Sequence, residues 1–346
     1  MEIQRELFHV SGPLHLLNSF DWRNTFHRRS LVASLVQGVK ILEKDRQRRS
    51  IQQDAHAHAP PWWEGFHFQL SHVLVDDKDS SYFGAIFELK YAHPFFYQST
   101  PTPPKYVIAF RGTIKSTTRS EDMKLNIKLI FNKLEKSSRF HKAFEAVWNT
   151  VMTVGPTNVW LAGHSLGASM AMLAGRNMMK AQCKLETYLF NPPFLSLPIE
   201  KMIKNQTLKH GVRIAGSLLK AGTAKAINLY RKDPEEDLFV VLSDWTPYMF
   251  VNPSDPICAE YIGYFEHRMK MEGSGRIGRI ERTASRYTMR SLVSGAVGRD
   301  SEPLHLLPTA YMTVNNRPSE NFKEAHGIHQ WWQQHFRWRS MLYKFN

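Results

Sequence analysis

The sequence has few cysteines and no long apolar segment. Its 346 residues include only two cysteines, Cys183 and Cys258, too few for a disulfide framework or a four-ligand zinc site. No run approaches the roughly 20 apolar residues that a membrane-spanning helix needs. Residues 1–20 lack the basic and then apolar order of a secretory signal peptide. These absences favour a reducing intracellular compartment, by default the cytoplasm.

Positive charge exceeds negative charge, but it is spread along the chain. Lys and Arg number 45 against 31 Asp and Glu, which gives a formal net charge of +14. Two basic concentrations stand out, at 44–49 and at 268–299, and neither has zinc-finger, basic-zipper or aromatic-interleaved spacing. We therefore expect a solvated basic surface and no nucleic-acid partner, with peripheral contact to an anionic membrane left open. The oligomeric state is not predicted.

Hydrophobic patterning predicts an α/β fold. Hydrophobic residues make up 42% of the chain, as in ordinary globular proteins. Residues 21–46 are predicted to form a helix capped by Asp21, and 66–75 and 83–90 alternate as antiparallel strands do. Five short apolar runs follow, at Tyr106–Phe110, Val159–Ala162, Thr187–Phe190, Tyr248–Val251 and Tyr311–Val314. A helix is predicted over 166–180, between the second and third of them. This alternation indicates a mostly parallel sheet with helices on both faces.

We expect one domain, residues 1–346, with an N-terminal helical extension over 1–60. Two segments interrupt the alternation, 198–237 and 268–300, and their positions suggest cap or lid insertions. The histidines at 56 and 58 lie in a predicted loop without a carboxylate, so they are not expected to bind metal. No metal or organic cofactor is predicted.

Residues 163–167 read Gly-His-Ser-Leu-Gly and fit the G-x-S-x-G pattern. The pattern alone is weak, but here an apolar strand leads directly into it and a helix leads directly out. That is the arrangement of a nucleophile elbow, in which a tight turn projects the serine above the sheet. Gly163 and Gly167 flank the serine because the backbone there is crowded. Ser165 is therefore the candidate nucleophile, preceded by His164.

A serine nucleophile needs a base and an orienting acid, which in this fold type follow in the order Ser, Asp or Glu, His. Asp255 lies in a tight loop directly after the strand 248–251 and is the candidate acid. His326 and His329 both follow the strand 311–314, at the start of a predicted C-terminal helix. His326 is favoured as the base because it lies nearer the loop and precedes Gly327, and His329 remains the alternative.

The oxyanion that forms in acyl transfer needs two hydrogen-bond donors. The main-chain amide of Leu166, directly after the serine, is one candidate. The second is expected from the loop after the strand 106–110, where Thr113 offers an amide and a hydroxyl and Gly112 allows close approach.

Taken together, these residues resemble the class 3 lipase family of α/β-hydrolases over about 83–335. Phe110-Arg-Gly-Thr113 is similar to the family's oxyanion segment, Phe140-His-Lys-Ala-Phe144 to its V-H-x-G-F stretch with Ala143 in place of glycine, and 163–167 to its G-H-S-L-G elbow. Glu121-Asp122 stands where the family has D-W-x-x-D. The whole chain, with the His-Arg-Arg-Ser run at 27–30 and Trp331 after His326, resembles a plant subgroup labelled "GDSL esterase/lipase", although no G-D-S-L occurs here.

The resemblance implies a serine hydrolase that cleaves carboxylic esters, with acyl lipids as the expected substrates. Two alternatives share the same residues. A hydrolase fold can serve as a non-catalytic binding protein for a lipid or hormone, and an acyltransferase differs only in whether an alcohol or water reaches the acyl-enzyme.

Overall fold

A computed structural model describes residues 12–52, 61–90, 102–112, 134–194, 238–272, 307–334 and 337–344. In this part of the chain eight strands form one sheet in the spatial order β1 to β8. Their bounds are β1 Phe68–Val75, β2 Tyr82–Leu89, β3 Tyr106–Phe110, β4 Val159–His164, β5 Glu186–Phe190, β6 Tyr248–Val251, β7 Ala310–Asn315 and β8 Trp338–Tyr343.

The sheet is parallel at its centre and antiparallel at both edges. Strands β3 to β7 pair in parallel, β1 and β2 pair antiparallel to each other, and β2 pairs antiparallel to β3. The predicted α/β-hydrolase architecture is confirmed, as is the antiparallel pair before β3. Strand β8, which pairs antiparallel to β7, was not anticipated. All strand ends that carry candidate site residues lie on one rim, because parallel strands point the same way.

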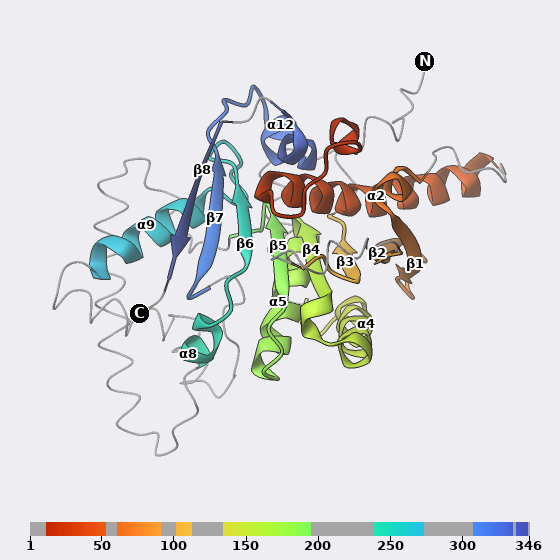
Figure 1. Cartoon of the computed structure of the whole chain (residues 1–346), viewed down its shortest axis with the longest axis horizontal. Coiled ribbons are helices and arrows are strands. Elements are labelled where there is room, and N and C mark those ends of the chain that lie inside the picture. The colour runs from red at the N-terminus through yellow and green to blue at the C-terminus, as the bar shows by residue number, and fades with distance from the viewer. Residues whose placement is uncertain are drawn as a thin grey trace.

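Helices cover both faces of the sheet (Figure 1). Helix α2 crosses one face, and α4 and α5 lie on the opposite side, where α8 and α9 also pack. The helices are α2 Thr25–Gln52, α4 Ser138–Val154, α5 Leu166–Lys180, α8 Leu238–Ser243, α9 Glu260–Glu272 and α12 Phe322–His326, with 3-10 helices η1 Leu14–Leu16, η2 Trp62–Phe66, η4 Pro156–Asn158 and η5 Ile328–Trp332. Each face has its own apolar core, and the sheet joins them.

Two predictions about helix ends were wrong. Helix α2 begins at Thr25, and the side chain of Asn24, not Asp21, accepts a hydrogen bond from a first-turn amide, that of Phe26. Asp21 instead accepts from the amide of Arg23 in a tight turn. The expected C-terminal helix is also absent from the described residues 327–334 and 337–344. Helix α12 ends at His326, where Gly327 has extended backbone, and η5 follows.

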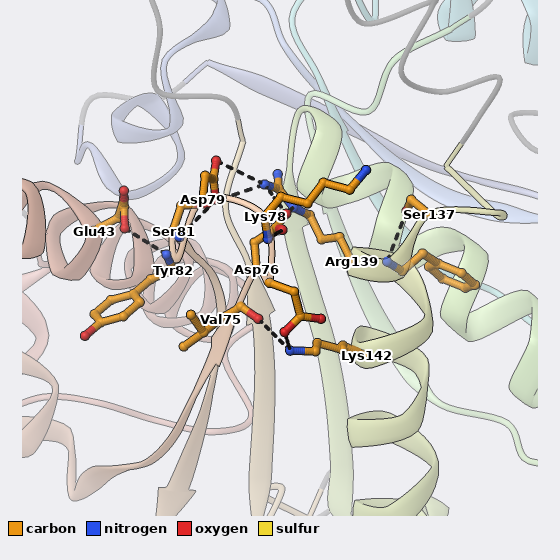
Figure 2. Close-up of polar contacts among 12 residues, drawn as sticks. Glu43, Val75, Asp76, Lys78, Asp79, Ser81, Tyr82, Ser137, Arg139 and Lys142 are labelled. Atoms are coloured by element: carbon orange, nitrogen blue, oxygen red, sulfur yellow. Dashed lines mark hydrogen bonds and ion pairs between the residues drawn. The ribbon is translucent and has the colours of Figure 1, made fainter.

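The turn between β1 and β2 is fastened to the start of α4 (Figure 2). Arg139 Nε donates to a carboxylate oxygen of Asp76 at 2.6 Å, and Lys142 pairs with Asp77 and donates to the carbonyl of Val75. The side chain of Ser137 caps α4 by accepting from the amide of Phe140. These contacts join the antiparallel edge to the helix before β4.

The predicted cap insertions at 198–237 and 268–300 lie outside the described residues, apart from 268–272, which belong to α9. The single-domain prediction stays a prediction. None of the described helices is both long and apolar enough to cross a membrane.

Candidate active site

The strand–turn–helix around Ser165 has the backbone of a nucleophile elbow. Ser165 has φ 54° and ψ −123°, a strained conformation for a residue with a side chain, and it lies between β4 and α5. A Cβ on Gly163 would lie 2.1 Å from the carbonyl oxygen of Gly167, and one on Gly167 would lie 2.2 Å from that of Phe110. Glycine is therefore required on both sides of the serine, because close backbone fixes the turn.

The end of β3 lies against this elbow. A Cβ on Gly112 would approach both the Cβ of Ser165 and the carbonyl of His164 to 3.1 Å. Arg111 holds this strand end, since its guanidinium donates to the carbonyl of Gly112 at 2.8 Å and to that of Tyr82. Thr113, the predicted oxyanion donor, lies outside the described residues.

The other predicted donor, Leu166, is the first residue of α5. The main-chain N–H groups in the first turn of a helix have no acceptor within the helix. The amide of Leu166 is therefore available at the helix end that favours negative charge.

The structure brings Asp255 and His326 together. Nδ1 of His326 lies 2.8 Å from Oδ2 of Asp255, and the two side chains come from the loop after β6 and the last residue of α12. Asp255 is fully buried and His326 is 9% exposed. His329, the alternative base, lies instead beside Gln37 of α2, 3.5 Å between the two Nε2 atoms, and its ring packs on Trp332.

Four donors surround the carboxylate of Asp255. His326 Nδ1, Asn191 Nδ2 and Cys258 Sγ lie 2.8, 2.7 and 3.1 Å from Oδ2, and the amide of Ile257 donates to Oδ1 at 3.0 Å. Burial alone would raise the pKa of Asp255, but the charge and hydrogen bond of His326, with the donors Asn191 and Ile257, outweigh it and lower that pKa. The carboxylate is thus kept ionised beside the imidazole.

Asn191 was missed as a site residue; its sequence signal, Asn-Pro-Pro after a strand, indicated only the end of β5. It has φ 46°, a left-handed conformation that asparagine tolerates. Trp331 Nε1 donates to its Oδ1 at 2.8 Å, and an indole N–H can only donate. The amide nitrogen of Asn191 therefore faces Asp255 and the carbonyl of Ala325, at 2.7 and 3.1 Å.

Two rings pack against the imidazole of His326. The ring of Phe322 stacks on it at 5.2 Å with an interplanar angle of 10°, and the ring of His164 lies 4.8 Å away. His164 Nε2 also donates to the main-chain carbonyl of His326 at 2.7 Å. The residue next to Ser165 therefore contacts the segment that carries His326.

Among the described residues, no three His, Cys, Asp or Glu side chains are grouped so as to hold a metal ion. The histidines at 56 and 58 lie outside these residues. The prediction that no metal or cofactor is needed stays a prediction.

Comparison with known proteins places the chain in a family. The sequence profile of the family Lipase (class 3) matches residues 95–214. GDSL esterase/lipase At4g10955 of Arabidopsis thaliana is 45% identical over 353 residues, which span 99% of each chain. A lipase from Rhizopus microsporus var. chinensis, known from a crystal structure, gives a TM-score of 0.26 at 15% identity and covers 46% of this chain and 57% of that one. Given the full-length relationship to the Arabidopsis protein, the chain belongs to the class 3 lipase family of carboxylic ester hydrolases.

Proposed function

We propose that this protein hydrolyses esters of acyl lipids through a covalent acyl-enzyme on Ser165. His326 acts as the general base and Asp255 orients it. Since Nδ1 of His326 is engaged by the carboxylate of Asp255, the other ring nitrogen, Nε2, is the one that serves Ser165.

The reaction proceeds in two halves. Ser165 Oγ attacks the ester carbonyl carbon while His326 Nε2 takes its proton, and the tetrahedral intermediate then expels the alcohol, which receives that proton. Water next attacks the acyl-enzyme carbonyl while His326 Nε2 takes its proton. The second tetrahedral intermediate then collapses: His326 gives that proton to Ser165 Oγ, the bond from Oγ to the acyl carbon breaks, and the carboxylic acid leaves with Ser165 and His326 restored. In both halves the amides of Leu166 and Thr113 stabilise the oxyanion, and loss of one such donor costs about 100-fold in turnover.

The contact between Asp255 and His326 is the observation that carries this proposal. The pair is buried, the imidazole is held 2.8 Å from the carboxylate, and the neighbour of Ser165 donates to the backbone of His326. The strained turn at Ser165 supports the same assignment, because strain of this kind persists where the surroundings hold it and clusters at active sites.

The test compares Ser165→Ala with Ser169→Ala, which removes the hydroxyl of a buried serine one turn further along α5. On a short p-nitrophenyl ester, Ser165→Ala is expected to lose turnover by several orders of magnitude, as is His326→Ala. Ser169→Ala is expected to keep it. A fluorophosphonate should label the unmodified protein and Ser169→Ala but not Ser165→Ala. Full activity of Ser165→Ala on the ester would refute the mechanism.

Acyl lipids are proposed as substrates because the family and the Arabidopsis relative carry the names lipase and esterase. Peripheral contact with an anionic membrane is proposed from the net charge of +14. An activity profile over p-nitrophenyl esters and glycerolipids tests the substrate class, and a competing alcohol separates hydrolysis from acyl transfer. A repurposed binding protein with a misaligned site would label poorly with the fluorophosphonate.

A further inference from the structure

Three consecutive main-chain carbonyls around His326 accept hydrogen bonds from side chains. The carbonyl of Ala325 accepts from Asn191 Nδ2 and Gln330 Nε2, at 3.1 and 2.8 Å. The carbonyl of His326 accepts from His164 Nε2 at 2.7 Å, and that of Gly327 from Gln330 Nε2 at 2.9 Å. The last carbonyls of a helix lack partners within it, so at the end of α12 side chains supply them.

Gln330 supplies two of these bonds, and its orientation is determined by main-chain groups. The amides of Ser254 and Arg317 donate to the Oδ1 atoms of Asn252 and Asn315, so each asparagine presents its Nδ2 as a donor. Both Nδ2 atoms donate to Oε1 of Gln330, at 2.9 and 2.8 Å. Nε2 of Gln330 is therefore the end that faces the His326 segment.

These amides tie the segment to the rim of the sheet. Asn252 directly follows β6 and Asn315 is the last residue of β7, the neighbouring parallel strand. Gln330 lies in η5, and it is 6% exposed while the two asparagines are 0% and 2% exposed. Buried amides that lose their partners are costly, so the cluster favours a single arrangement.

We propose that Gln330 is a positioning residue for His326. Its amide, which Asn252 and Asn315 orient, holds the backbone of residues 325–327 in a fixed position relative to the ends of β6 and β7. The proposal rests on the proposed function, because it assigns Gln330 a task only if His326 is the base. Gln330 itself contacts backbone and amides, and so it acts through His326.

The variant Gln330→Met tests this role, since methionine has similar length and no donor. The carbonyls of Ala325 and Gly327 each lose a bond, and the imidazole shifts. A displacement of about 1 Å can cost about 100-fold in rate, so kcat on a short p-nitrophenyl ester is expected to fall by about that factor. KM is expected to change by less than about 3-fold, because an interaction used only in the transition state acts on kcat.

Trp245→Phe is the matched control. It removes one buried hydrogen bond, from Nε1 of Trp245 to the carbonyl of Leu185 just before β5, at the opposite end of the strands. It is expected to lower the melting temperature and leave kcat unchanged. If Gln330→Met does not fold, Asn315→Asp replaces it. That side chain still accepts from Arg317 but cannot donate to Gln330, and about a 10-fold fall in kcat is expected.

A double-mutant comparison separates the two proposals. In a His326→Ala background, Gln330→Met is expected to slow fluorophosphonate labelling no further, because the residue acts through the missing imidazole. Suppose that His326→Ala is inactive, so that the proposed function stands. The positioning role is then wrong if Gln330→Met keeps the kcat of the unmodified protein, as Trp245→Phe does. It is also wrong if Gln330→Met slows fluorophosphonate labelling by the same factor in the His326→Ala protein as in the unmodified protein. If His326→Ala keeps full activity, the proposed function itself fails.

Discussion

The imidazole of His164 donates from Nε2 to the main-chain carbonyl of His326 across 2.7 Å. One side chain thus joins the turn that carries Ser165 to the segment that carries His326, two parts of the chain that fold from separate regions of the sequence. Because a carbonyl can only accept, Nε2 of His164 carries a hydrogen. Burial, then the charge of His326, lowers the pKa of His164 well below 6.5, so the ring is neutral in the folded protein.

This pKa predicts a pH dependence of stability. Below 6.5 the unfolded chain protonates His164 before the folded protein does, so falling pH favours unfolding, by up to about 1.4 kcal/mol per pH unit. Above 6.5 the group contributes no pH dependence. Urea unfolding of the protein and of His164→Gln, whose amide donates but does not titrate, measures the difference.

The expected result is a free energy of unfolding that falls more steeply below 6.5 in the unmodified protein than in His164→Gln. Asp255 does not obscure the change in slope below pH 6.5. Its pKa in the folded protein lies below the usual 3.8, so the stability that its ionised carboxylate contributes is lost only as the pH falls below 3.8 and through that lowered pKa. Equal slopes in the two proteins would show that His164 is not held neutral.

Asn191 offers a test of side chain against backbone. Asn191→Gly keeps φ 46° without strain but removes the donors to Asp255 and Ala325. It also removes the hydrogen bond that the buried N–H of Trp331 donates to Asn191, and loss of a buried hydrogen bond costs about 1–3 kcal/mol. We expect kcat to fall by about 10- to 100-fold, measured per labelled active site.

Gln182→Gly is the control for Asn191→Gly, because Gln182 also has a positive φ, 59°, and is exposed beyond α5. It is expected to keep kcat and to leave the protein at least as stable. Wild-type turnover in Asn191→Gly would mean that Asp255 is held without this amide.

How much the sequence could predict depends on how local each signal is. The strands β3 to β7 and the turn at Ser165 were found because buried runs and a Gly-x-Ser-x-Gly spacing are local patterns. Strand β8 is an edge strand with Arg339 and Ser340 inside it, so its apolar pattern is weak. The partners of Asn191 and Gln330 lie in other segments, and no local pattern indicates which amide meets which carbonyl. Nor does a local pattern tell whether Asp21 caps helix α2 or, as observed, accepts a hydrogen bond from the amide of Arg23 in the turn before that helix.

The glycines of the site are expected to differ in their tolerance of alanine. In Gly163→Ala the new Cβ meets main-chain atoms of Gly167 at 2.1 and 2.3 Å, which cannot rotate away. The free energy of unfolding of Gly163→Ala is expected to be lower by at least ~3 kcal/mol. In Gly112→Ala the nearest atoms are at 3.1 Å, so a shift of a few tenths of an ångström suffices. That variant should fold, with turnover lowered about 10-fold by displacement of Ser165. Thermal melts and ester turnover test both, and a wild-type melting temperature for Gly163→Ala would contradict the packing.

Helix α2 lies outside the span matched by the family profile, 95–214, yet it contacts the segment of His326. Arg29 Nε donates to the carbonyl of Trp331 at 3.0 Å, and Leu35 is fully buried in the core on that face of the sheet. We therefore expect Leu35→Asp, which buries a carboxylate there, to prevent folding of the whole enzyme. Ser50→Asp, at an exposed position near the end of the same helix, is the control and should be neutral.

The measurements are soluble yield, melting temperature and fluorophosphonate labelling of Ser165. If the rest of the protein could fold without α2, Leu35→Asp would only release this helix from the sheet, and fluorophosphonate labelling of Ser165 would be unchanged. If α2 is part of the catalytic unit, labelling and cooperative melting are lost together. The second outcome is expected, because one core contains both Leu35 of the helix and Trp331 of the segment that follows His326.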